Sequence, residues 1–286
     1  MQEPRVLDTT IARHLRAKLP QPIAEVAVFT LKQLWACLFG GLLLLAIIFT
    51  NAIWASGWPI ARYDALFAFA IVTQAAMLFF KLENWQEAKV IALFHITGTA
   101  MEIFKVKVGS WAYPEEAFFM VVDVPLFSGF MYASVGSYIA RVIRIFNMQF
   151  TCYPPFWVTA VLATSIYVNF FSHHYVPDIR LALFVATVIV FWNTRVVFSV
   201  GSTYPLPLAA LFASFFLWIA ENVGTLTGTW VYAGSRTFEM TSISKIGSWY
   251  LLLYVAFVTV TLIKCISIST KSTSETPSVR SHQRSN

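Results

Sequence analysis

Eight long apolar stretches, separated by charged residues, proline or glycine, run along the chain. They lie near residues 34–56, 63–81, 88–105, 117–140, 155–173, 179–199, 205–226 and 246–266. A helix needs about 20 mostly apolar residues to cross a bilayer, and each stretch is close to that length. Because open sheets and loops leave backbone groups unpaired in lipid, the pattern predicts an all-α polytopic transmembrane helix bundle of about eight spans.

Polar segments lie at both ends of this apolar region. Residues 1–30 carry Arg13, Arg16 and Lys18 beside two leucines, which is typical of an amphipathic segment on the cytoplasmic surface and not of a cleavable signal. Residues 269–286 are rich in Ser and Thr and predict a disordered cytoplasmic tail. The transmembrane domain is therefore expected over residues 31–268.

Composition and charge agree with a membrane protein. The chain is 58% hydrophobic and 12% charged, whereas soluble proteins carry roughly a quarter charged residues, so a soluble nucleic-acid-binding protein is excluded. Of the 20 Lys and Arg residues, fourteen fall on the side of the N-terminus and six on the other side. Positive charge collects in cytoplasmic loops, so both termini are expected in the cytoplasm. The basic excess requires no nucleic-acid partner.

A four-residue motif occurs twice, at an offset of 119 residues. Its two copies are Glu102, Gly109, Trp111, Tyr113 and Glu221, Gly228, Trp230, Tyr232. The copies end the third and seventh stretches, so four spans separate them and both run in the same direction. This predicts an internal repeat of two parallel four-helix halves, about 31–148 and 149–268.

The motif places a glutamate in each of two spanning helices. A carboxylate at that depth is costly, and such residues are functional candidates by default. Glu102 has Lys105 three residues on, which leaves a simple ion pair open. Glu221 has no basic residue within four positions. The tryptophans and tyrosines of the motif are typical of an interfacial aromatic belt, and they are also candidates for binding a substrate.

Most other intramembrane polar residues fall in the same outer half of the predicted topology. We expect six of them to converge with the glutamates on an outward-facing cavity: His95, Asp123, His173, His174, Asp178 and Arg180. All of these except His95 are candidates for catalysis or its support, and Asn169 and Asn222 are candidates for substrate binding. The stretch from Glu83 to Lys89 is expected to be a solvated turn.

A divalent metal is an alternative use of the histidines. Imidazole and carboxylate suit zinc, iron or manganese, and His95, His173 and His174 are the candidate ligands. Adjacent residues on a helix point about 100° apart, so His173 and His174 can share an ion only if the helix ends there.

Several runs resemble a bacterial membrane family, the domain-of-unknown-function family 817. They lie at residues 98–105, 109–114, 124–132, 169–175 and 220–225, and the resemblance extends over about residues 30–268. It implies a multi-pass protein of the bacterial inner membrane and supplies no activity.

The order of a helix-borne Glu, then Gly, Trp, Tyr and Val-Pro, is also similar to that in carotenoid-modifying membrane proteins, the lycopene cyclases and carotenoid hydratases. That similarity implies acid-catalysed chemistry on a polyene, with a protonated Glu donating to a double bond and aromatic faces stabilising the cation. The cyclases carry paired carboxylates after the in-helix proline, whereas Leu126, Phe127 and Ser128 follow Pro125 here.

Three classes of function remain open. The first is a membrane enzyme that uses Glu102 and Glu221 as acid/base groups on a lipid or isoprenoid. The second is a proton-coupled secondary transporter, and the third is an assembly protein without chemistry. Transporters often have broken spans in matching positions of both halves, and Pro125 has no proline counterpart in the eighth stretch, which favours the enzyme. Membrane lipid and a hydrophobic small molecule are the expected partners; the cofactor and the oligomeric state stay open.

Overall fold

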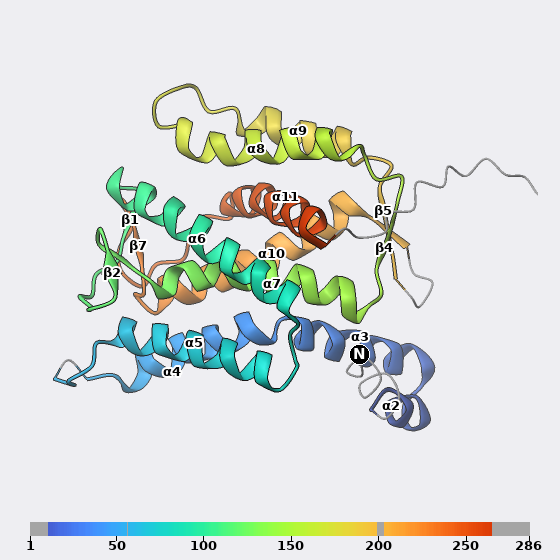
Figure 1. The fold of residues 1–286 in the computed structure, drawn as a ribbon, viewed down its shortest axis with the longest axis horizontal. Helices are drawn as coiled ribbons and strands as arrows, with labels where there is room; N and C mark the ends of the chain where they lie inside the picture. Colours follow the sequence, from blue (N-terminus) through green and yellow to red (C-terminus); the bar gives the residue numbers. More distant parts are fainter. Residues whose placement is uncertain (1–10, 56, 199–202, 265–286) are drawn as a thin grey trace, which may run out of the picture.

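The computed structural model describes residues 11–55, 57–198 and 203–264, and helices dominate it. They form three layers (Figure 1). The outer layers are α4 (Leu38–Ile53) with α5 (Arg62–Phe79), and α8 (Phe156–Ser172) with α9 (Arg180–Val190). Between them lie α6 (Trp85–Lys107), α7 (Phe127–Ile145), α10 (Leu206–Leu226) and α11 (Lys245–Lys264). The short helix α2 (Ala12–Lys18) and α3 (Gln21–Ala36) precede this bundle.

The helices suit a lipid environment, and the expected all-α transmembrane bundle is confirmed. Among the described residues, α5, α10 and α11 are long and apolar enough to cross a bilayer, and α3 with α4 forms a fourth candidate bent by 73°. The 11 residues of α9 extend only about 16 Å, against a hydrocarbon thickness of about 30 Å. The total of eight spans therefore stays a prediction.

The fourth apolar stretch is shorter than expected as a helix. Residues 117–126 lie outside any helix, and β2 (Met120–Val121) pairs there with β3 (Val124–Pro125). Val122 and Asp123 both have positive φ, 51° and 62°, as a two-residue hairpin turn demands. Pro125 cannot donate a helical hydrogen bond, so α7 begins only after it.

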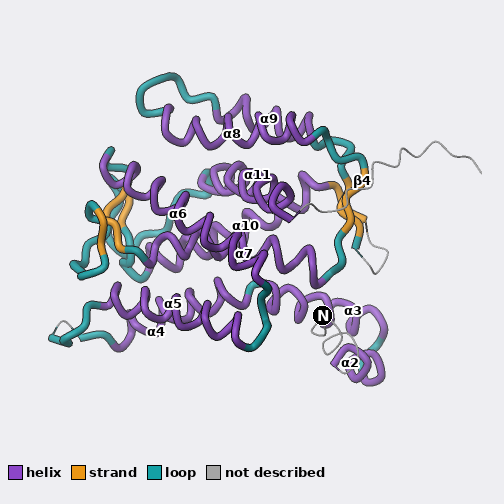
Figure 2. Tube along the Cα trace, viewed as in Figure 1, coloured by secondary structure: helices purple, strands orange, loops and turns teal. Residues whose placement is uncertain are grey.

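The sixth stretch also ends early as a helix, at Val190. A turn follows, and then β5 (Arg195–Val197) pairs with β4 (Gln149–Thr151) and β6 (Thr203–Pro205) at the end of the bundle opposite β2 and β3 (Figure 2). The β-branched pair Val196 and Val197 favours this extended conformation.

The expected domain boundary at residue 30 falls inside α3. The predicted tail at 269–286 and residues 1–10 lie outside the described residues.

The packing of the layers repeats along the chain. α4 contacts α7 and α10, and α8 contacts α11 and α6 in the corresponding way. The last residues of α4 and α8, Ile53 and Ser172, are 119 positions apart, as are the last residues of α6 and α10, Lys107 and Leu226. The relation of two four-helix halves by a two-fold axis stays a prediction.

Glycines let α6 and α7 cross closely. A Cβ atom at Gly98 would lie 2.6 Å from the Cβ of Tyr132, and one at Gly129 would lie 2.2 Å from Oγ1 of Thr99. Small residues permit such close approach between membrane helices. The crossing matters for the site because it brings Tyr132 of α7 beside Glu102, one turn after Gly98 on α6.

Charged side chains are buried where α5, α6 and α7 meet at the other end of the bundle. Glu83 and Glu87 have fully buried side chains, so the expectation of a solvated turn over 83–89 is wrong. Ser137 donates to Glu83 at 2.6 Å and Arg144 to Glu87 at 2.9 Å, while Arg141 donates to two main-chain carbonyls at 2.7 Å. These partners compensate the cost of burying the carboxylates.

Candidate functional site

The two copies of the repeated motif fold into the same turn. α6 leads through Gly109 (φ 71°) to β1 (Trp111–Ala112), and α10 leads through Gly228 (φ 62°) to β7 (Val231–Tyr232). In each turn the amide after the glycine donates to the carbonyl five residues earlier, at 2.9 Å. The positive φ explains the glycine, because other residues are strained in that conformation.

β1 and β7 then pair with each other, which brings the two copies together. The pairing is antiparallel and sets Trp111 opposite Tyr232, with ring centroids 5.6 Å apart. The tryptophan of the first copy thus faces the tyrosine of the second copy.

Glu102 is held by three donors. Trp111 Nε1 and Tyr113 Oη donate to its Oε2 at 2.7 and 2.8 Å, and Tyr132 Oη donates to Oε1 at 2.6 Å. The Lys105 ammonium lies instead against the histidines, so an ion pair with Lys105 does not account for Glu102. Hydrogen bonds to both oxygens fix this carboxyl group in one orientation.

Glu221 is held on one side only. Trp230 Nε1 and Tyr232 Oη donate to Oε1 at 3.1 and 2.6 Å, which reproduces two of the three contacts of Glu102. No hydrogen bond from the described part of the chain reaches Oε2. Lys245, whose Nζ lies 3.7 Å from the centre of the Tyr232 ring, is close enough to attract Glu221 electrostatically.

Both glutamates line a cavity of about 1110 Å³. It extends from their carboxyl groups to the bend between α3 and α4, where Cys37 lies on its wall. Apolar side chains of α7, α10 and α11, such as Ile139, Phe216 and Leu252, form most of the lining. A long, mainly apolar chamber whose charged groups lie at one end has the form of a site for a hydrophobic molecule with a polar end.

The predicted residues after α8 gather beside the same end of the cavity. His173 donates through Nδ1 to the carbonyl of Asn169 at 2.8 Å, so its Nε2 is an acceptor and faces Lys105 Nζ at 3.4 Å. His174 Nε2 lies 2.9 Å from the same ammonium. Desolvation, and then the positive charges of Lys105 and Arg180, lower the pKa of His174, which favours its neutral form.

Asn169 and Asn222 anchor loops and do not line the cavity. Asn169 donates to Asp178 at 3.2 Å and accepts from the amide of Ile179, while Asn222 accepts from the amide of Thr241 at 2.8 Å. Asp178 in turn holds Arg180, which does line the cavity. The asparagines therefore position the chain around the site, in place of the substrate contact expected of them.

Two predicted residues lie elsewhere. Asp123 is exposed in the β2–β3 turn, since the expected helix does not reach it. His95 stacks on Phe130 at 4.3 Å and is ten residues, about 15 Å of helix, from Lys105 and the other histidines. Within the described residues no three His, Cys, Asp or Glu side chains form a group that could hold a metal ion, so the histidines do not converge as a metal site would need.

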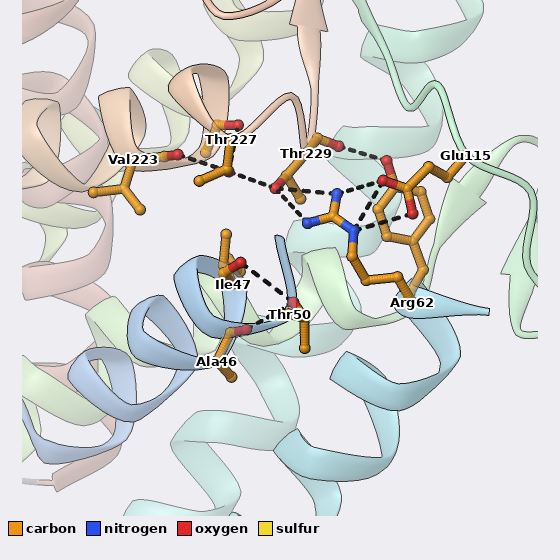
Figure 3. Close-up of polar contacts among 10 residues, drawn as sticks. Ala46, Ile47, Thr50, Arg62, Glu115, Val223, Thr227 and Thr229 are labelled. Atoms are coloured by element: carbon orange, nitrogen blue, oxygen red, sulfur yellow. Dashed lines mark hydrogen bonds and ion pairs between the residues drawn. The ribbon is translucent and has the colours of Figure 1, made fainter. Parts of the chain in front are cut away.

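A buried arginine connects the two turns that carry the motif. Arg62, at the start of α5, is almost fully buried; its Nε donates to Glu115 at 2.9 Å and its Nη1 to Thr229 Oγ1 at 3.4 Å (Figure 3). Tyr63 donates to the carbonyl of Thr229 at 2.7 Å. These contacts join α5, the loop after β1 and the turn that carries Trp230.

Sequence reasoning missed three residues of this site: Tyr132, Lys105 and Lys245 as cavity-lining groups. Tyr132 reaches Glu102 from 30 positions away only because α6 and α7 cross closely. From the sequence, Lys105 is only a candidate ion-pair partner of Glu102 on the same helix. Lys245 is the first residue of α11, where a positive charge is unfavourable for the helix. This unfavourable position is the sequence signal that points to a role for Lys245 in the site.

Fold and site together define a polytopic helical membrane protein with an apolar cavity that ends at two aromatic-bound glutamates. Residues 25–257 match the family described as "Protein of unknown function (DUF817)", and the chain belongs to this family, as its sequence runs indicated. A relative from Bacillus subtilis (strain 168), "Uncharacterized protein YoaT", is 41% identical over 246 residues, which cover 85% of this chain and 92% of the relative. The similarity to carotenoid-modifying proteins stays a prediction.

Two solved structures are similar at a TM-score of 0.46. They are a cross-linked trimer of MvINS, at 14% identity, and MvINS itself, described as a mycobacterial Insig homolog from Mycobacterium vanbaalenii, at 13% identity. Each comparison covers 65% of this chain and 97% of the other.

Proposed function

We propose that this protein is a membrane enzyme that acts on a lipid or isoprenoid by carboxylate acid/base chemistry. The observation that carries the proposal is the pair of glutamates, each bound by the Trp and Tyr of its own motif, at the polar end of one large apolar cavity. Glu83 and Glu87 are also buried, but Glu87 pairs with an arginine and Glu83 lies 3.9 Å from one, whereas Glu102 and Glu221 face an apolar chamber, where a carboxylate is costly.

The different hydrogen bonding of the glutamates suggests different roles. Both oxygens of Glu102 accept hydrogen bonds, so Glu102 positions the aromatic side chains around it. Glu221 keeps Oε2 without a hydrogen bond from the described residues, and it lines the cavity. Glu221 is therefore the proposed acid/base group: it gives a proton to the bound substrate, or takes one from it, through Oε2.

The aromatic donors assist this proton transfer. Trp230 and Tyr232 both contact Oε1, which directs the other oxygen of Glu221 away from them. Their hydrogen bonds stabilise the carboxylate left when the proton has moved, and Lys245 adds an attractive charge.

The proposed setting is the bacterial inner membrane, with both termini in the cytoplasm and the glutamates in the outer half. Trp85, Trp157 and Trp192, at helix ends on the predicted cytoplasmic side, are strongly exposed, as expected of residues at a membrane interface. Exposed apolar residues such as Leu45, Phe49 and Val72 suit contact with lipid tails. The two four-helix halves are part of the same proposal.

The test compares the lipids of bacterial membranes that contain the wild-type protein, no protein or Glu221→Gln, by untargeted mass spectrometry. Glutamine keeps the size of the side chain and cannot exchange the proton, so a lipid or isoprenoid that changes with the wild-type protein is expected to revert in the variant. Glu116→Gln is the matched control, because Glu116 is exposed in the outer loop.

Membrane levels of each variant, measured by immunoblot, separate lost chemistry from lost folding. The host should be a bacterium that naturally carries a member of this family, so that the substrate is present. Identical lipid profiles in all membranes of that host would overturn the proposal of a lipid enzyme. Proton uptake driven by the protein and abolished by Glu221→Gln would then favour a proton-coupled transporter.

A further inference from the structure

We propose that the polar end of the cavity binds a phosphate or diphosphate group, so that the substrate is an amphiphile with a phosphorylated head. This inference rests on the proposed function and names the substrate class of the same site. It is carried by three cationic side chains, from three helices, that line the cavity beside the glutamates: Lys105 of α6, Arg180 of α9 and Lys245 of α11.

The cationic groups lie close to one another. Arg180 and Lys245 are both near enough to Lys105 to act on it electrostatically, and Arg180 also acts on Lys245. Asp178 pairs with Arg180, and Glu221 attracts Lys245, so two carboxylates offset part of the positive charge of the three cations. The remaining positive charge favours binding of an anion. A phosphate group supplies two negative charges and several acceptor oxygens in one place.

Lys105 and Arg180 retain donors that can reach a ligand. The Lys105 ammonium contacts the imidazoles of His173 and His174, and no carboxylate among the hydrogen bonds and ion pairs of the described residues. Arg180 binds Asp178 through Nε, while Nη1 turns toward Ser248 of α11 at 3.4 Å. Ser248 and His173 also line the cavity, so hydroxyl and imidazole groups complete the set.

The positions of Arg180 and Lys245 support the same conclusion. Each is the first residue of its helix, and neither helix has an acidic residue in its first turn. Asp178, two residues before α9, already accepts from the amide of Arg180, which shows that this helix start binds an anionic group. The N-terminus of a helix carries partial positive charge, so basic residues there oppose helix stability while they strengthen a site for an anion. Two helices of 11 and 20 residues place this feature at the same end of one cavity.

The arrangement also orients the ligand. A phosphorylated head between Arg180 and Lys245 directs its apolar tail along the chamber toward the bend of α3 and α4. The first atoms of that tail then pass Glu221, since Lys245 attracts both the head and this carboxyl group. Proton transfer by Glu221 would accordingly occur close to the phosphate end of the substrate.

The test measures the unfolding temperature of the full-length protein in a neutral detergent, with three probes over matched concentration series: hexadecyl phosphate, hexadecanol and inorganic phosphate. We expect hexadecyl phosphate to stabilise the wild-type protein at a concentration at least ten-fold lower than hexadecanol. Arg180→Gln and Lys245→Gln should each remove most of that difference. Arg236→Gln, a change of an exposed arginine on the same side, should keep it.

The response to hexadecanol shows that each variant is folded with an intact chamber. Equal stabilisation by hexadecanol and hexadecyl phosphate would overturn the phosphate site and leave the proposed enzyme on an uncharged substrate. Stabilisation by inorganic phosphate alone, abolished by Arg180→Gln, would support a phosphate site but identify free phosphate as its ligand and overturn the lipid enzyme. No response to any probe would overturn both proposals.

Discussion

At the scale of single residues, the glutamates depend on side chains that the chain places nine and eleven positions later. The second copy of the motif has a further requirement, because the Trp230 ring lies directly on α10. A Cβ atom at Gly224 would lie 1.9 Å from that ring. The residue 119 positions earlier is Lys105, so only the second tryptophan needs a glycine beneath it.

Gly224→Ala is therefore expected to push Trp230 away from Glu221 and lower the free energy of unfolding by about 1–3 kcal/mol, the usual cost of overpacking. Denaturant unfolding in detergent measures the change. Gly41→Ala in α4 is the control, since no atom lies within 4 Å of its new Cβ and alanine favours a helix by up to about 1 kcal/mol. Equal behaviour of the two variants would contradict the packing argument.

At the scale of elements, the site is a junction of two helix–turn–strand units. β1 and β7 pair only with each other among the described strands, so this two-stranded ladder alone would be weak. Arg62 and Tyr63 of α5 hold it from outside through Glu115 and Thr229. An arginine that bridges two turns in this way stabilises both copies of the motif at once.

Arg62→Gln should loosen this junction selectively. Hydrogen–deuterium exchange by mass spectrometry is expected to quicken at residues 108–116 and 227–234, because Glu115 and the buried Thr229 lose their donor. Exchange in the distant β4–β5–β6 sheet should stay unchanged. Arg236→Gln, at an exposed residue, serves as the control. A uniform change of exchange rates across the chain would contradict a local stabilising role of Arg62.

At the scale of the whole molecule, the repeated helix order and the charge bias predict one topology. The loops that carry Glu116 and Arg236 are expected outside, and the turn that carries Asn147 inside; all three residues are exposed. Single cysteines placed there, in a variant whose own cysteines are replaced, report the sidedness.

Glu116→Cys and Arg236→Cys should react with a membrane-impermeant maleimide in intact cells, and Asn147→Cys only after permeabilisation. The opposite labelling would invert the orientation, and reaction of all three in intact cells would contradict the arrangement of the spans between them. Neither result depends on the proposed chemistry.

The sequence by itself determined the membrane class, the helical bundle and the family, since long apolar stretches permit only a few backbone structures in lipid. It also singled out both glutamates with their tryptophans and tyrosines, because the repeated spacing is local and survives folding. Helix ends were less predictable: the apolar runs at 117–126 and 191–197 read as helix, but turn geometry and strand pairing decided otherwise.

The tertiary structure alone decided which distant groups meet. Close crossing of α6 and α7 brings Tyr132 to Glu102, and the first residues of α9 and α11 bring Arg180 and Lys245 to the cavity. The same packing leaves His95 apart from His173 and His174, although all three share a predicted depth in the membrane. Periodicity along a chain gives depth and helix face, whereas contacts between helices depend on crossing angles and loop paths that no local pattern encodes.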